Sequence, residues 1–548
     1  MIKKLFNNRL FLNSSPSGSV ASAALVITVA GLASRILGLF RDHFLASTFG
    51  AGDVLDAYDA AFRIPDLIYN FLILGALSAA FIPVFTNLIS QDKDDEAWDL
   101  ANGVINLAVF FIVIVSLVCF VFAPFLMKII TPGFPPEKID LVVRFTRIMF
   151  LSPLFLGLGG IVGGILTSYK RFLVYSIAPI FYNIGIIFGV LVLVRFMGPI
   201  GIAWGVVLGA FLHLAVQLPA AKNLGFRYIP AVKKYFSNKD VRHVGKLMIP
   251  RTLGIAVTQA NLFIITIFAS TLNAGTLAIF SFAQNLQSVP LGIFGVSFAI
   301  AVFPTLSSLA TKDKEEDFIS AFSETFRQVL FFVIPLSIFM LILRAQIVRV
   351  TLGSGKFDWE DTTLTFECLG IFVMSLFAQS VIPLLTRTFY AMQNTKTPFY
   401  IAIASEVVNI GAVLLLIGKY NILGLTIAFS ISNLFQMFFL LFALRMKFDY
   451  LDDKRIVSSI SKIAIASFLA GVGVQIFKYI VAGLVDMDTF IGVFLQLTVS
   501  AGVGLSIFIA ICQIMNLEEY MRFKKSFTAR IFKAKKVITE DMGEVSGI

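Results

Sequence analysis

Long apolar segments, separated by short polar breaks, recur along almost the whole of this chain. About fourteen can be marked in the 548 residues, the first beginning near residue 21 and the last ending near residue 515. One membrane-spanning helix needs about 20 predominantly apolar residues, so each segment is long enough to cross a bilayer. Charged residues make up only 14% of the chain, whereas soluble proteins carry about 25%. The sequence therefore predicts an all-α integral membrane protein of about 14 transmembrane helices.

Lysine and arginine are unevenly distributed between the breaks. If both termini are cytoplasmic, the inside segments hold about 28 of the 44 Lys and Arg residues, and the outside loops hold about 8. Cytoplasmic loops of membrane proteins carry such an excess. We therefore expect both termini inside. The basic stretches at 222–246 and 522–536 then fit anionic lipid head groups, and no nucleic-acid partner is expected.

Two halves of the chain resemble one another at a spacing of about 220–226 residues. AAFIPVFTNL at 79–88 pairs with IAVFPTLSSL at 300–309, and FYNIGIIFGV at 181–190 pairs with VVNIGAVLLL at 407–416. Parallel repeats of this kind are typical of alternating-access transporters. We expect two pseudo-symmetric six-helix halves plus a C-terminal helix pair. The predicted parts are a cytoplasmic segment 1–20, lobes at 21–221 and 246–445, a basic linker 222–245, the pair 446–515 and a basic tail 516–548.

Charged side chains are concentrated in the first two apolar segments. The first carries Arg35, Arg41 and Asp42, and the second carries Asp56, Asp59, Arg63 and Asp66. On a helix, the second set and Asn70 lie within about 80° of one another. A charge at bilayer depth costs roughly 2.5–3.5 kcal/mol, so we expect a water-filled cavity lined by these two helices. Asp59 and Arg63 can neutralise one another, and Asp42 and Asp56 can instead lie near the outer mouth.

The sequence contains no recognisable catalytic or metal-binding pattern. Its three histidines are scattered, at His43, His213 and His243, and its three cysteines each sit in an apolar run, at Cys119, Cys368 and Cys512. It also lacks the GxxxxGK[ST] loop that cradles nucleotide phosphates. We therefore expect a protein that is not an enzyme and that uses no cofactor and no metal.

Five motifs carry a resemblance to a known family. They are ASRILGLFRD at 33–42, DAYDAAFRIPDL at 56–67, TPGF at 131–134, GSGKFD at 353–358 and FYAMQNTKTP at 389–398. In this order they resemble the MurJ (MviN) family of lipid II flippases, in the multidrug/oligosaccharidyl-lipid/polysaccharide exporter superfamily. The resemblance covers about residues 21–515. It implies fourteen helices with both ends cytoplasmic, in the bacterial cytoplasmic (inner) membrane.

The resemblance also implies a binding site. The family moves an undecaprenyl-pyrophosphate-linked disaccharide pentapeptide to the outer leaflet, and a cationic central cavity receives its pyrophosphate. Arginine suits this task because its planar fork donates two parallel hydrogen bonds to phosphate oxygens. The family's cavity residues match Arg35, Arg41, Asp42, Asp56 and Arg63 of this chain.

Two family arginines are replaced in this chain. After Pro65 the family usually reads Asn-Leu-Leu-Arg-Arg, whereas this sequence has Asp66 in place of the Asn and Tyr69 in place of the first Arg. In the eighth segment Gln284-Asn285 stands where the family has an Asp-Arg pair. Arg251, in the seventh segment, is a candidate replacement for the missing charge. Tyr69, Asn285 and Arg251 therefore complete the predicted substrate-binding set.

Three functions are compatible with these residues. The first is a lipid II flippase that works by alternating access, with the lipid-linked precursor and membrane lipids as its partners. The second is a MurJ-like paralogue that exports another polyprenyl-linked glycan or an amphipathic molecule. Tyr69 and Asn285 favour this second reading, because neutral polar groups suit sugars. The third is a non-transporting scaffold that recruits cell-wall assembly proteins through its basic cytoplasmic segments.

Overall fold

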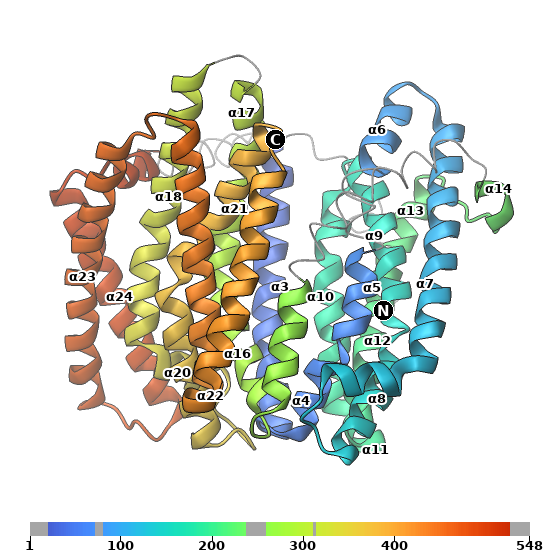
Figure 1. The fold of residues 1–548 in the computed structure, drawn as a ribbon, viewed down its shortest axis with the longest axis horizontal. Coiled ribbons are helices and arrows are strands. Elements are labelled where there is room, and N and C mark those ends of the chain that lie inside the picture. Colours follow the sequence, from blue (N-terminus) through green and yellow to red (C-terminus); the bar gives the residue numbers. More distant parts are fainter. Residues whose placement is uncertain (1–19, 72–80, 237–258, 311–313, 526–548) are drawn as a thin grey trace, which may run out of the picture. The chain divides into compact units, whose positions relative to one another are not determined.

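A computed structural model describes the chain except for residues 1–19, 72–80, 237–258, 311–313 and 526–548 (Figure 1). The described part is nearly all helical and contains no strand. Within it, nine helices are long and apolar enough to cross a membrane, and the bent pair Trp359–Met374 and Leu376–Ala391 makes a tenth. The predicted all-α membrane class is thus confirmed. The count of fourteen stays a prediction, because predicted spans 2 and 7 fall partly on residues 72–80 and 237–258.

The chain divides into two compact units. Unit 1 consists of residues 1–282 with 351–362, and unit 2 consists of residues 283–350 with 363–548. The predicted lobe boundary at 222–245 lies partly outside the described residues and stays a prediction.

Unit 1 holds the helices of the first half of the sequence. They are α3 (Val20–Phe49), α4 (Asp53–Ala61), α5 (Arg63–Tyr69), α6 (Ile82–Ser90), α7 (Asp94–Ile130), α8 (Pro136–Met149), α9 (Ser152–Ser168), α10 (Phe172–Phe188), η3 (Gly189–Leu193), α11 (Val194–Met197), α12 (Ile200–Ala215), α13 (Leu218–Asn223) and α14 (Val232–Phe236). A further helix, Gln259–Ser270, and the first turns of α16 (Thr276–Pro290) also belong to it.

Glycines let two helices of unit 1 approach closely. A Cβ atom added to Gly185 of α10 would collide with the backbone of Gly209 of α12, and one added to Gly189, which begins η3, would collide with the backbone of Gly205 of α12. Small residues at such contacts are the usual means by which membrane helices pack, because backbones can then touch. This contact fixes α10 on α12 and so fixes the position of the polar residues that α10 carries.

The second predicted span is broken between α4 and α5, at Phe62. Pro65 explains the break, because proline has no N–H with which to continue the helical hydrogen bonds of the preceding turn. The break separates Asp56 and Asp59 on α4 from Arg63 and Asp66 on α5.

The segment 351–362 folds back onto the end of α3. The backbone N–H of Lys356 donates to the carbonyl of Ser47 (2.9 Å), and the N–H of Ala51 donates to Oδ2 of Asp361 (2.8 Å). Gly50 makes the turn after α3 with φ of 68°, a left-handed value that favours glycine. The end of α3, with residues 50–51 after it, and the GSGKFD motif at 353–358 therefore meet at one place in unit 1.

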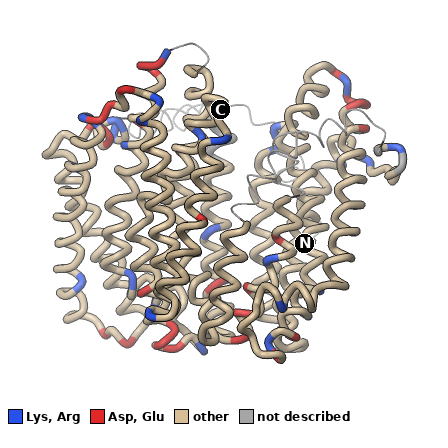
Figure 2. The backbone as a smooth tube through the Cα atoms, viewed as in Figure 1, with Lys and Arg blue, Asp and Glu red and all other residues tan. Residues whose placement is uncertain are grey.

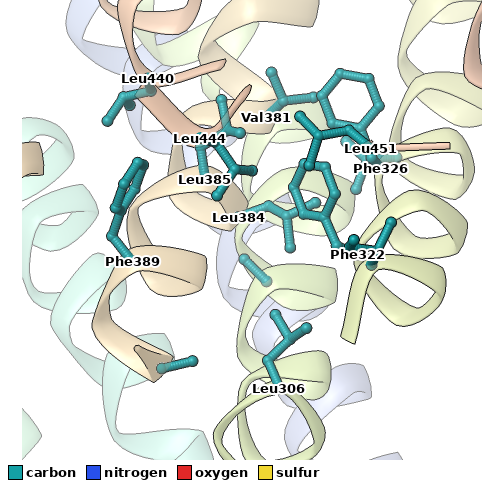
Figure 3. Packing of buried hydrophobic residues seen from close by; sticks show 14 of the residues in the cluster. Leu306, Phe322, Phe326, Val381, Leu384, Leu385, Phe389, Leu440, Leu444 and Leu451 are labelled. Carbon is teal, nitrogen blue, oxygen red and sulfur yellow. The ribbon is translucent and has the colours of Figure 1, made fainter. Parts of the chain in front are cut away.

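Unit 2 is built from the helices of the second half. They are η4 (Leu291–Val296), α17 (Ser297–Ala310), α18 (Glu315–Ile342), α19 (Arg344–Thr351), α20 (Trp359–Met374), α21 (Leu376–Ala391), α22 (Lys396–Lys447), α23 (Asp453–Ala482) and α24 (Phe490–Ile514). Its main core joins α18, α21 and α22 through Phe322, Phe326, Leu384, Phe389 and Leu440 (Figure 3). The predicted C-terminal helix pair is α23 and α24, which pack on each other and on α18.

Each unit has the charge pattern of a membrane protein. Lys, Arg, Asp and Glu gather toward the ends of the helices, and the middles are largely free of them (Figure 2). Large apolar side chains remain uncovered between the charged ends; Leu117, Val121 and Phe125 of α7 are 62–64% exposed. Soluble monomers rarely expose large contiguous apolar patches, so this face of α7 suits contact with lipid.

Candidate functional site

Arg41 of α3 forms the first polar contact of the candidate site. Its Nε and one terminal nitrogen donate to Oδ1 of Asp42 at 2.9 and 2.8 Å, and its other terminal nitrogen donates to Oδ1 of Asn183 on α10 at 3.3 Å. Asn183 in turn donates to the backbone carbonyl of Ser34 (3.2 Å). These bonds use three of the five guanidinium N–H groups. The Arg41 side chain is 23% exposed, so donors remain for a ligand.

Asp56 of α4 is held by a complete set of donors. Lys138 of α8 donates to its Oδ2 (2.7 Å), as does the backbone N–H of Gly275 (2.7 Å), and the N–H of Ala278 donates to its Oδ1 (3.0 Å). The side chains of Asp56 and Lys138 are only 1% and 4% exposed. Lys138 also pairs with the exposed Asp53 (2.8 Å). The Asp56 carboxylate therefore has less room for a ligand than any other predicted residue of α3 to α5.

Arg63 is the first residue of α5, and one edge of its guanidinium is held by a hydrogen bond. Its Nε donates to the hydroxyl of Thr266 (2.7 Å), whose own proton goes to the carbonyl of Leu262 (2.8 Å). Arg63 interacts electrostatically with Asp59, as the sequence predicts, and also with Asp66. Thr266 accepts only from Nε, and among the described residues no hydrogen bond is formed by the terminal nitrogens of the guanidinium, which are therefore available to anions.

Phenol side chains surround these charges. Tyr58 interacts electrostatically with Arg41, and Tyr182 of α10 interacts with Arg41, Asp66 and Tyr69. Tyr69 and Asp66 are half-buried. Arginine N–H groups can bind phosphate oxygens and tyrosine hydroxyls can bind sugar hydroxyls, so the arrangement fits a ligand that carries both.

A comparison with protein families decides where this chain belongs. The model of the family described as lipid II flippase MurJ matches residues 45–495, well over half of the sequence. The chain belongs to the MurJ family. A MurJ relative from Bdellovibrio bacteriovorus, named a probable lipid II flippase, is 31% identical over 468 residues, which cover 83% of this chain and 87% of the relative.

Solved structures show the same fold. A lipid II flippase MurJ in an inward closed conformation aligns with a TM-score of 0.74 at 24% identity, over 90% of this chain and 98% of that one. An inward-facing multidrug resistance transporter of the MATE family, in the MOP superfamily, aligns with a TM-score of 0.65 at 14% identity, over 78% and 95%. The chain therefore shares its fold with the MurJ and MATE-family transporters.

The structure brings some of the predicted MurJ-like site residues into contact within unit 1. Arg41 and Asp42 are paired, and Asp56, Arg63 and Tyr69 lie on the neighbouring broken helix. Arg35 is half-buried on α3, six residues or about 9 Å along the helix axis from Arg41. Asn285 is half-buried in the part of α16 that belongs to unit 2. Arg251 lies outside the described residues.

Three partners of this site were missed by the sequence reasoning. Asn183 was visible as a polar residue inside an apolar repeat segment, and that signal could have identified it. Thr266 carries no such signal, because a threonine is unremarkable in a span. Lys138 carries no such signal either, because its partner Asp56 lies 82 residues earlier, a separation that helical spacing does not reveal.

Proposed function

We propose that this chain is a lipid II flippase, moving the polyprenyl-pyrophosphate-linked head group of the peptidoglycan precursor from the inner to the outer leaflet by alternating access. One observation carries the proposal: a chain of the MurJ family keeps Arg41 half-buried and paired, with N–H donors left for phosphate. The sequence repeat supports the same mechanism, since parallel repeats are typical of such transporters.

The residues of the site have different roles in substrate binding, which follow from their contacts. Arg35, Arg41 and Arg63 hold the phosphates, with Arg251 as a further cation. Asp42 and Asn183 orient Arg41 by fixing three of its N–H groups. Tyr69 and Asn285 offer neutral polar groups to the sugar. Asp56 contributes by joining α4 to α8 through Lys138.

We further propose that the protein lies in the bacterial inner membrane with both termini in the cytoplasm. The excess of Lys and Arg in the inside segments supports this orientation. The basic linker and tail then face anionic lipid head groups, and cell-wall assembly proteins are candidate partners for them.

A second candidate function is export of a different polyprenyl-linked glycan. The exchanges at Tyr69 and Asn285 favour it, because two arginines of the family pattern are replaced by neutral groups. A cargo with fewer phosphates and more hydroxyls would need fewer cations.

Complementation separates these functions. A bacterium depleted of its own lipid II flippase would receive the wild-type chain, Arg41→Ala, or the matched control Arg144→Ala, an exposed arginine of α8 that pairs with Asp140. Membrane insertion of each variant is checked by immunoblot. We expect rescue by wild type and by Arg144→Ala, and loss of rescue by Arg41→Ala.

The other outcomes each favour an alternative. Rescue by Arg41→Ala would show that transport does not need the Arg41 guanidinium, and would contradict the role assigned to it here. Failure of the well-inserted wild type, together with rescue by the Tyr69→Arg, Asn285→Arg double variant, would show that the replaced arginines select a different cargo. Failure of both would contradict lipid II as the cargo.

A further inference from the structure

Asp66 is a carboxylate that the MurJ-like motif does not call for. It stands in α5 where the family pattern usually has asparagine. Its neighbours Ile64, Pro65 and Ile68 are buried, while Asp66 itself is half-buried. Within the described part of the chain, no side chain donates a hydrogen bond to this carboxylate or forms a direct ion pair with it. A polar group of this kind, inside a predicted span, calls for a physical explanation.

The charged and titratable groups around Asp66 are few. Arg63 and Tyr69 act on it from its own helix, and Tyr182 acts on it from α10. Of the helices packed against α5, α9 has no titratable residue, and α7 has only Cys119 between Asp99 and Lys128. The titratable residues of α8 are Glu137, Lys138, Asp140, Arg144 and Arg147, and those of α4 are Asp53, Asp56, Tyr58 and Asp59.

Most of these groups are already paired. Lys138 is bound to Asp53 and Asp56, and Arg144 is bound to Asp140. Asp59 has a side-chain hydrogen bond with Ser281 and interacts with Arg63. Arg63 is therefore the one cation acting on Asp66 among the described residues, and it is shared with Asp59.

When both carboxylates are ionised, the Asp59–Arg63–Asp66 cluster therefore carries a net charge of −1. Asp42 does not change this, because Arg41 neutralises it. Net charge at bilayer depth is expensive, and a single proton makes the cluster neutral. The two carboxylates share this proton. Among the described residues the ionised form of Asp59 has the Ser281 hydroxyl as a partner, whereas Asp66 has no hydrogen-bond donor.

We propose that Asp66 is a proton-binding site and that binding of the anionic head group is accompanied by uptake of one proton there. The inference rests on the proposed function, which brings a pyrophosphate to Arg41 and Arg63. A diphosphate diester carries two negative charges, and negative charge beside a carboxylate favours its protonated form. By linkage, protonation of Asp66 favours head-group binding to the same extent. The proton also lowers the net charge that crosses the membrane with the head group from −2 to −1.

Calorimetry tests this inference directly. The purified full chain in nanodiscs is titrated with lipid II in two buffers of different ionisation enthalpy, which reports the number of protons bound. At a pH high enough for both carboxylates of the free cluster to be ionised, wild type and Asp66→Glu are expected to take up about one proton per lipid II, and Asp66→Asn about none. Asp66→Asn restores the residue usual in the family, so it is expected to fold. The matched control is Asp140→Asn, an exposed carboxylate of α8, which should behave as wild type.

Affinity gives a second readout. One linked proton changes Kd by up to tenfold for each pH unit, so wild-type affinity should weaken as pH rises, and that of Asp66→Asn should change little. Lipid II binding without proton uptake by wild type, or with equal uptake by Asp66→Asn, would overturn the inference alone. Absence of lipid II binding by every variant would overturn the proposed function and this inference with it.

Discussion

At the scale of single residues, the ion pair between Lys138 and Asp56 is the contact with the clearest energetic consequence. Both side chains are almost fully buried. Removing one partner of a buried pair leaves an uncompensated charge, which typically costs 3–5 kcal/mol. We therefore expect Lys138→Met to lower the free energy of unfolding by about 3–5 kcal/mol, measured by denaturant titration in detergent micelles.

Two variants control for other effects of this change. Asp53→Asn removes the exposed partner of Lys138 and should cost less than about 1 kcal/mol. The double variant Lys138→Met, Asp56→Leu removes both buried charges and should recover part of the loss. A cost for Asp53→Asn as large as that for Lys138→Met would contradict this account.

The same residues show where sequence reasoning ends. Arg41 and Asp42 are adjacent in the chain, so their pairing was within reach of the sequence. Arg63 was expected to interact with Asp59, one turn away, and it does. Its hydrogen bond to Thr266 joins residues 203 positions apart, and such a contact depends on tertiary packing that a single sequence does not encode in any short pattern.

At the scale of elements, the close contact between α10 and α12 depends on glycine, whose side chain is a single hydrogen atom. A Cβ at Gly185 would meet the backbone of Gly209, whereas Gly411 of α22 has nothing within 4 Å of the same position. Overpacking costs about 1–3 kcal/mol, and alanine is about 1 kcal/mol better than glycine inside a helix. We expect Gly185→Ala to destabilise the protein and Gly411→Ala to stabilise it. Equal shifts in thermal stability for the two variants would be evidence against the close contact.

A second link between elements depends on pH. Arg455 of α23 donates to the Glu518 carboxylate at 2.6 and 3.2 Å, and this bond holds the pKa of Glu518 below its ordinary value. A lowered carboxyl pKa means that the link stabilises the fold at neutral pH and is lost as pH falls through that lowered pKa. Both side chains are about half exposed, so the contribution is about 0.2–1 kcal/mol.

Hydrogen exchange is the suitable measurement for this link. Backbone exchange around residues 517–525, corrected for its intrinsic pH dependence, should increase below about pH 4, the ordinary range of a carboxyl group. Glu518→Gln should remove the acid-induced step and exchange faster at neutral pH. An acid step of unchanged size in Glu518→Gln would assign the effect to another carboxylate.

Element directions were harder to predict than element existence. Residues 362–391 form one of the fourteen apolar segments and so are predicted to be one span; the structure bends this segment by 47° between α20 and α21. Two further apolar segments, 398–418 and 422–444, are separated in the sequence by a short polar break. The structure has a kink at this break, at Asn421 of α22, whose φ is 46°. Hydropathy reports how long an apolar stretch is; the direction of the chain is set by side-chain packing and by single backbone angles.

At the scale of the whole molecule, composition and the sequence motifs were sufficient to predict the all-α membrane class and the MurJ family. The orientation of the chain in the membrane is the property that next needs a measurement. The inside and outside loops predicted from Lys and Arg include exposed positions that can be labelled. Asp140 is expected outside and Asp95 inside, and both are exposed in the structure. Replacing Cys119, Cys368 and Cys512 by alanine gives a background for single introduced cysteines.

A membrane-impermeant maleimide added to intact spheroplasts should label Asp140→Cys and leave Asp95→Cys unlabelled until the membrane is permeabilised. The physical reason is that a cytoplasmic excess of Lys and Arg opposes translocation of the segments that carry it. Because both residues are exposed, failure to label cannot be due to burial of the side chain. The reverse pattern would put the termini outside. It would also invert the direction of head-group movement relative to the site on α3 to α5, and so contradict transport toward the outer leaflet from a cytoplasmic opening.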